Sequence, residues 1–198
     1  MVRGRATLDD ASFDARWLGA AVRKDGLLTP CQLTLPPVSN GRYEIPVMSA
    51  SQAYGCGAPG AEIVLWTYAH DKQYFSTRTV AWPGDGHTAT FDASFATATP
   101  DGAAGPRTEF AGEIFDREGR RLPDGTRVDA YVGDTLCGVA SVRTYDDFTG
   151  FSLTVVGPTA IAGCTQGATL HFRVGGQWAL NTAVNDFQTD PSFDLYLP

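Results

Sequence analysis

The residues that could perform acid–base or nucleophilic chemistry are few in this sequence and far apart. The histidines are His70, His87 and His171. No Gly-x-Ser-x-Gly motif supplies an activated serine for any of them. Acidic groupings occur at Asp9-Asp10, at Asp146-Asp147 and at Asp85 beside His87, without the alternating ligand spacing of a calcium loop. We interpret all of these as solvated turn residues and expect no enzyme activity, no cofactor and no metal site.

Cysteines offer a different chemistry, that of a covalent cross-link. The four lie at Cys31, Cys56, Cys137 and Cys164. A zinc site would favour short Cys-x-x-Cys pairs, which this sequence lacks. Buried free thiols are a second alternative, because cysteine packs well in cores. Disulfides persist in oxidising compartments, so two bridges would indicate an extracellular or cell-surface protein.

The choice among these alternatives depends on an internal repeat. Landmarks around the cysteines occur twice along the chain in the same order. The matching landmarks, first half before second, are Gly4 and Gly112, Gly55-Cys56 and Gly163-Cys164, Glu62–Leu65 and Thr169–Phe172, and Phe91-Asp92 and Phe193-Asp194. Several landmarks in one order over this length indicate the duplication of a single module.

The cysteines obey the same repeat. Cys31 corresponds to Cys137 and Cys56 to Cys164, with separations of 25 and 27 positions. Of the three connectivities that four cysteines allow, only pairing within each copy respects the duplication. We therefore expect one disulfide per copy. On a chain-entropy estimate, each bridge stabilises its module by roughly 3–4 kcal/mol.

The elements that position these residues are predicted to be short strands. The chain holds 22 glycines and 12 prolines, which suits strands joined by tight turns and disfavours long helices. Asp9–Ala21 reads as a loop leading into a strand. The segment 96–107 is small, polar and rich in Gly and Pro, and reads as a linker. The sequence thus predicts an all-β protein of two Ig-like β-sandwich modules, residues 1–95 and 108–198.

Charge and hydropathy exclude several classes of partner. The formal net charge is −7, and the basic residues are scattered, so we expect no nucleic-acid partner. No apolar run approaches the ~20 residues of a membrane-spanning helix. Met1–Asp10 lacks the apolar core of a signal peptide, so we expect an export signal to lie outside this sequence.

One strand carries an unusual pattern for a surface. If Ile63 and Leu65 point inward, as we expect for Leu170 and Phe172 in the second copy, the alternate residues of the strand point outward. Large apolar side chains on an outward face require a cover. The cover is expected from the chain itself, including Phe13 and Trp17, from a neighbouring molecule, or from a sugar ring. The predicted interaction face consists of Val64, Trp66, Tyr68, Tyr74 and Trp82.

A family resemblance comes from the second copy. Gly112–Ala130, followed by Gly150–Val155, resembles the transthyretin-like modules of the carboxypeptidase regulatory-like and Cna B-type class. The resemblance implies a prealbumin-like Greek-key sandwich with a supporting, spacing or adhesive role and no catalytic residues. The cysteine pairs depart from the general pattern of those modules. Some Cna B-type modules form Lys–Asn isopeptide bonds, but the only lysines here are Lys24 and Lys72, both in the first copy.

The interpretation of the whole sequence is a non-catalytic extracellular structural or adhesive protein. We expect a protein partner or self-assembly, in a surface or filament-like assembly. A carbohydrate-binding module is the second interpretation, because flat aromatic rings can stack on sugars. A small secreted hydrolase is the third, because catalytic groups can converge from distant loops.

Overall fold

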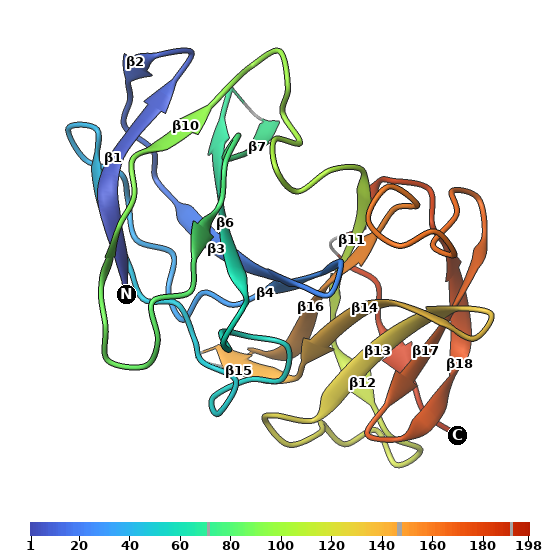
Figure 1. Ribbon diagram of the computed structural model, residues 1–198. Helices are drawn as coiled ribbons and strands as arrows, with labels where there is room; N and C mark the ends of the chain where they lie inside the picture. Colours follow the sequence, from blue (N-terminus) through green and yellow to red (C-terminus); the bar gives the residue numbers. More distant parts are fainter. Residues whose placement is uncertain (71, 146–147, 191) are drawn as a thin grey trace. The chain divides into compact units, whose positions relative to one another are not determined.

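The computed structural model describes residues 1–70, 72–145, 148–190 and 192–198, and within them every regular element is a β-strand (Figure 1). The predicted all-β class is confirmed. The stretch 9–21 contains the short strand β2 and an isolated bridge at Ala15, as a loop leading into a strand should. No helix with the length and apolarity of a membrane span occurs among the described residues.

The chain divides into two compact units. Unit 1 holds Met1–Lys24, Pro30–Gln52 and Cys56–Gly105, and unit 2 holds Asp25–Thr29, Ala53–Gly55 and Pro106–Pro198. The finer predicted boundaries, with modules at 1–95 and 108–198 and a linker at 96–107, stay a prediction.

Among the described residues, ten strands lie in the first half of the chain and ten in the second half. The first ten are β1 (Val2–Leu8), β2 (Ala11–Ser12), β3 (Leu18–Lys24), β4 (Leu27–Pro30), β5 (Arg42–Ile45), β6 (Glu62–Ala69), β7 (Lys72–Phe75), β8 (Val80–Ala81), β9 (Ala89–Thr90) and β10 (Ala93–Phe95). The rest are β11 (Arg107–Gly112), β12 (Ile114–Phe115), β13 (Arg127–Val132), β14 (Thr135–Ser141), β15 (Arg143–Tyr145), β16 (Phe148–Val156), β17 (Thr169–Val174), β18 (Gln177–Val184), β19 (Thr189–Asp190) and β20 (Leu195–Tyr196).

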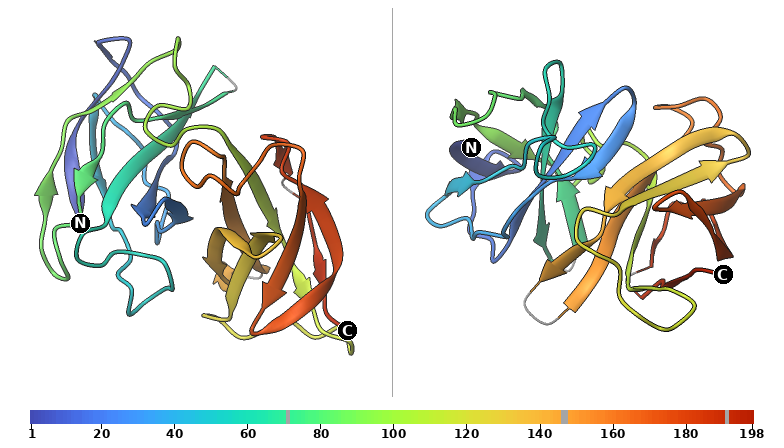
Figure 2. Two further views of the ribbon diagram at one scale, coloured as in Figure 1. Left: turned by 45° about the vertical axis from the view of Figure 1, so that its right-hand side comes forward. Right: turned by 90° about the horizontal axis from the view of Figure 1, so that it is seen from below.

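In unit 1, β1 organises one layer of the sandwich. It pairs antiparallel with β2 and β5, and parallel with β9 and β10. The other layer contains β3, β6 and β7 in this order, and β8 also pairs with β6. The layers are seen from two further directions in Figure 2.

Unit 2 repeats this plan. Strand β11 pairs antiparallel with β16 and parallel with β19, and β12 continues with a parallel pairing to β20. The facing layer has the order β14-β13-β17-β18. Side chains of β17 alternate as expected, with Leu170 and Phe172 buried and His171 and Arg173 exposed. Alternation of this kind lets one face of the strand fill the core.

The two copies share one detail of register at their first strands. At Gly4 and at Gly112, an added Cβ would collide with a backbone carbonyl, that of Phe91 or Phe193 respectively. The next residue's amide then donates to a carboxylate of the last-strand region, from Arg5 to Asp92 and from Glu113 to Asp194, each at 2.8 Å. Glycine is therefore required at both positions for the close approach of two backbones.

Each sandwich is closed by its own disulfide. Cys31 bonds to Cys56 and Cys137 bonds to Cys164, with Cα–Cα distances of 5.5 and 5.6 Å. All four cysteines are buried. The predicted connectivity is confirmed, and with it the prediction of two tandem sandwiches with one bridge each.

Candidate interaction surface

Of the acids that the sequence offers for chemistry, Asp9 lies near His70, whose charge makes a minor contribution to the lowered pKa of the Asp9 carboxyl. His70, His87 and His171 are all exposed, and in the described part of the chain none of their side chains hydrogen-bonds to a serine or a carboxylate. Asp146-Asp147 lies outside the described residues. No group of three or more metal-binding side chains gathers among the residues the structure describes.

Asp9 has a structural role instead. Its carboxylate accepts hydrogen bonds from the amide of Thr97 at 2.9 Å and from the Thr97 hydroxyl at 2.7 Å. The side-chain bond and then the backbone bond hold the pKa of Asp9 below its usual value. This carboxylate therefore ties the end of β1 to the chain that follows β10.

Two residues of the predicted interaction face are buried. Val64 is 0% exposed and Tyr74 is 4% exposed. Ile63 and Leu65 are buried together with Val64, so both faces of β6 are covered here. In such a strand burial does not alternate. Val64 and Tyr74 are therefore not exposed at the surface, contrary to the prediction.

Trp66 and Tyr68 form an aromatic cluster with Trp17. The ring centroids of Trp66 and Tyr68 are 5.9 Å apart and those of Trp17 and Tyr68 are 6.5 Å apart, in both pairs with nearly perpendicular planes. Trp17 is 40% exposed and Tyr68 is 42% exposed. Edge-to-face pairs of this kind stabilise beyond their buried area by ~0.5–1.5 kcal/mol. The chain itself thus covers part of the predicted interaction face, and the rings of Trp17 and Tyr68 stay partly exposed to solvent.

The backbone beneath the aromatic cluster explains its geometry. Gly19 lies opposite Trp66 in the β3–β6 pairing, and an added Cβ there would collide with the indole. The Thr67 hydroxyl donates to the carbonyl of Trp17 at 2.8 Å, which fixes the approach of the segment before β3. The guanidinium of Arg16 lies 4.6 Å from the centre of the Trp17 ring, a cation–π arrangement.

Trp82 belongs to a different surface. Its indole lies against Gly57, where any Cβ would collide with the ring. It lines an open hollow of about 450 Å³ together with residues such as Pro59 and Asp85. The five predicted residues therefore do not share one face, because only Trp66 and Tyr68 are brought together.

The backbone register shows that Trp82 and Asn185 occupy equivalent positions in the two copies. The amide of Trp82 donates to the carbonyl of Ala61 at 2.9 Å, and the amide of Asn185 donates to that of Ala168 at 3.0 Å. Both residues directly follow a strand of their layer. Trp82 packs against Gly57, the residue after Cys56, and Asn185 donates to the carbonyl of Cys164. The same position thus holds a tryptophan in unit 1 and an asparagine in unit 2, so residue identity gives no signal for it.

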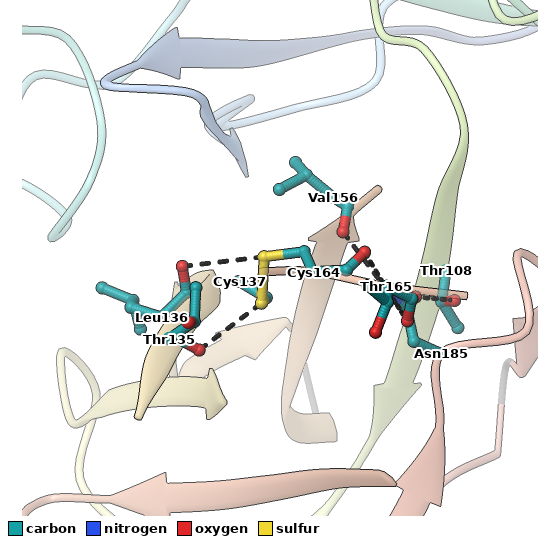
Figure 3. Close-up of a disulfide and its surroundings, with 8 residues drawn as sticks. All are labelled: Thr108, Thr135, Leu136, Cys137, Val156, Cys164, Thr165 and Asn185. Atoms are coloured by element: carbon teal, nitrogen blue, oxygen red, sulfur yellow. Dashed lines mark hydrogen bonds between the residues drawn. A yellow bond between two sulfur atoms is a disulfide. The ribbon is translucent and has the colours of Figure 1, made fainter. Parts of the chain in front are cut away.

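Asn185 is the hub of a buried polar network beside the second disulfide (Figure 3). Its side-chain nitrogen donates to the carbonyls of Cys164 at 3.2 Å, Thr165 at 3.3 Å and Val156 at 3.5 Å. Its side-chain oxygen accepts from the Thr108 hydroxyl at 2.6 Å. Asn185 is 0% exposed, and every polar atom of its side chain is satisfied. Such a network favours one packing arrangement over its competitors.

Comparisons with known proteins return little. No family model matches the sequence, and no curated protein matches it. Among solved structures, the shaft pilin SpaA from Lactobacillus rhamnosus GG is similar at 11% identity, with a TM-score of 0.24 over 99% of this chain and 96% of that one. Its D295N mutant gives 11% identity and a TM-score of 0.25, over 100% and 97%. TM-scores this low carry no argument about this chain.

The fold and the cysteines nevertheless define a class. The protein is an all-β chain of two sandwiches, each closed by its own disulfide. The resemblance of its second half to transthyretin-like modules stays a prediction.

Proposed function

We propose that this chain is a non-catalytic structural or adhesive protein that acts outside the cytoplasm, as part of a surface assembly. The observation that carries the proposal is the closure of each sandwich by a disulfide within itself. Such bridges persist where the environment is oxidising. The predicted kinship with Cna B-type modules, which support and space larger surface proteins, agrees with this role.

The aromatic cluster of Trp17, Trp66 and Tyr68 supplies a surface for a protein partner. Exposed aromatic side chains are the residues that most often dominate protein interfaces. A second copy of the chain is the simplest such partner. Self-association through the cluster predicts that particle size rises with protein concentration.

Light scattering over a wide concentration range tests this contact. We expect wild-type chain to grow in mean mass with concentration and Trp66→Glu to lose at least tenfold in association constant, because a carboxylate would be buried without a partner. Thr88→Glu, which adds the same charge at an exposed loop position of unit 1, should behave as wild type. Equal association by both variants would refute the contact through the aromatic cluster.

Carbohydrate binding is a second candidate, favoured by the half-open rings of Trp17 and Tyr68. Flat aromatic faces offer apolar platforms of the kind that sugar rings can cover. Binding predicts quenching of tryptophan fluorescence and retardation on polysaccharide gels, both lost in a Trp17→Ala variant. A flat response across neutral and acidic polysaccharides would refute this candidate and leave the structural one standing.

A further inference from the structure

The outer strand of one layer of unit 2 is unusually open. β18 pairs only with β17 and lies at the margin of the layer β14-β13-β17-β18 (Figure 1). Among the described residues, no second strand pairs with its other edge. An edge strand leaves alternate backbone N–H and C=O groups without strand partners, ready to accept another strand.

The composition of β18 does nothing to discourage such pairing. Gln177–Val184 contains no charged residue and no proline, the residues that usually prevent an exposed edge from pairing with another strand. Three large apolar side chains of the strand face solvent: Trp178 is 51% exposed, Leu180 is 67% exposed and Val184 is 49% exposed. Exposed apolar groups gathered on one strand mark an interaction site.

In unit 1, the edge equivalent to that of β18 is covered by another segment of the chain. The register makes β7 and β8 the counterparts of β18, and there Tyr74 and Phe75 are only 4% and 1% exposed. The segment after β10 adds backbone hydrogen bonds to this edge, from the Phe75 amide to Pro100 and from the Ala103 amide to the Ser76 carbonyl, both at 2.8 Å. In this fold the edge therefore accepts an added extended segment.

The inner side of β18 is firmly held. The side-chain amide of Asn181 donates to the carbonyl of Asp194 at 2.7 Å, and its oxygen accepts from the amide of Tyr196 at 3.2 Å. This anchorage turns Trp178, Leu180 and Val184 outward as a fixed row. A preformed edge loses little conformational entropy when it pairs.

We propose that β18 pairs antiparallel with the β18 strand of a second copy of this chain, which extends the layer across a two-fold axis. This rests on the proposed role in a surface assembly, and it places the contact between copies at β18 instead of at the aromatic cluster. A strand without charges is compatible with its own copy, since no like charges face each other. With Asn181 at the axis, Trp178 of each copy lies opposite Val184 of the other, and Leu180 opposite Thr182. Aromatic–β-branched pairs of this kind stabilise antiparallel sheets.

The area of a single strand edge sets the expected affinity. Stable complexes bury about 800 Å² per partner, more than one strand edge supplies. The dimer should therefore be weak, with a dissociation constant on the order of micromolar to millimolar. Because each chain carries a net charge of −7, added salt should strengthen the dimer by screening repulsion.

Sedimentation of the full chain at concentrations up to about 1 mM tests the proposal. We expect Leu180→Lys to raise the dissociation constant at least tenfold, and Val184→Lys to do the same. Leu33→Lys is the matched control, because Leu33 is an exposed leucine of unit 1 (53% exposed) outside the named strands. Leu180 is 67% exposed and Val184 is 49% exposed, so the variants should keep the wild-type melting temperature.

Hydrogen exchange locates the contact. Amides of Gln177–Val184 should gain protection as wild-type chain is concentrated, and should not gain it in Leu180→Lys. Association that survives Leu180→Lys but is lost in Trp66→Glu would overturn this proposal and keep the aromatic contact. Association lost only in Leu180→Lys would support it and refute that contact. A monomer at every concentration would overturn both, and leave the β18 edge for a strand of another protein.

Discussion

At the scale of single residues, Asn185 shows how unit 2 is specified. A buried amide is costly unless each of its polar atoms finds a partner. The partners here are three carbonyls and the Thr108 hydroxyl, contributed by segments far apart in the sequence. Thr108 in turn accepts from the amide of Phe187 at 2.9 Å, so the network reaches the chain that leads to β19.

Asn185→Ala should therefore lower the free energy of unfolding of unit 2 by about 2–4 kcal/mol, because carbonyls and a hydroxyl would lose their partners in a buried place. Urea denaturation followed by circular dichroism measures this change. Gln188→Ala, at an exposed neighbouring position, should change the value by less than about 0.5 kcal/mol. A loss for Asn185→Ala no larger than that of the control would contradict the role given to the network.

Asp116 organises the turn between β12 and β13. Its carboxylate accepts from the amides of Arg120 at 2.8 Å and Glu118 at 3.0 Å, and pairs with the Arg120 guanidinium at 2.8 Å. These bonds, led by the Arg120 amide, hold the pKa of Asp116 below its usual value of 3.8.

A lowered carboxyl pKa stabilises the folded protein above the unfolded-state pKa, and the stabilisation is lost as pH falls through the folded-state pKa. The stability difference between wild type and Asp116→Asn should therefore be constant from about pH 7 to about pH 5 and shrink towards about pH 2. Denaturation midpoints of both proteins at several pH values measure it. A difference that stays constant to the lowest pH would argue against a charged Asp116 as the cause.

At the scale of elements, the close approach of first and last strands depends on Gly4 and Gly112. Gly112→Ala should destabilise unit 2 by about 2–4 kcal/mol, because the new Cβ collides with the Phe193 backbone carbonyl, which cannot move as a side chain can. The unfolding free energy checks this value. The control is Ala111→Gly, at the adjacent position of β11. Gly167→Ala does not serve as a control, because Gly167 has a positive φ. Equal losses of unfolding free energy in Gly112→Ala and Ala111→Gly would show that the structure relieves the collision.

Sequence patterns predicted the elements whose environment is simple. Strands such as β5 and β17, with one face in the core, alternate in burial as they do in hydropathy. For β6, alternation predicts an exposed Val64, but Val64 is buried because both faces of the strand are covered there. Local periodicity does not encode such a cover. The equivalence of Trp82 and Asn185 was out of reach because the two side chains share no chemistry and only the backbone register relates them.

The candidate surfaces illustrate the same limit. The sequence predicts that Trp66 and Tyr68 share a face and that the chain itself, including Phe13 and Trp17, can cover it. Trp17 does contact Tyr68, in a geometry set by Gly19 and the Thr67 hydroxyl, whereas Phe13 packs on Phe95 instead. The open edge of β18 was not predicted, because strand order within a layer follows from tertiary pairing. In the sequence, an edge strand without charges reads like any short β-type run.

At the scale of the whole molecule, the repeated disulfide predicts separable stabilities. Replacing Cys137 and Cys164 together by alanine should cost unit 2 about 2–5 kcal/mol, and the same change at Cys31 and Cys56 should cost unit 1 a similar amount. Calorimetry should show one of two transitions shifted in each double variant. Equal shifts of both transitions in either variant would mean that the units unfold together.

The parallel pairing of first and last strands has a mechanical consequence for each unit. β1 runs alongside β9 and β10, and β11 alongside β19, so the entry and exit of each unit lie at opposite ends of neighbouring strands. Tension applied through the chain would load their hydrogen bonds in shear, all at once, instead of peeling them open one by one. Resistance to pulling depends on the unfolding barrier, and this strand order raises that barrier along the direction in which a tethered chain would be stretched.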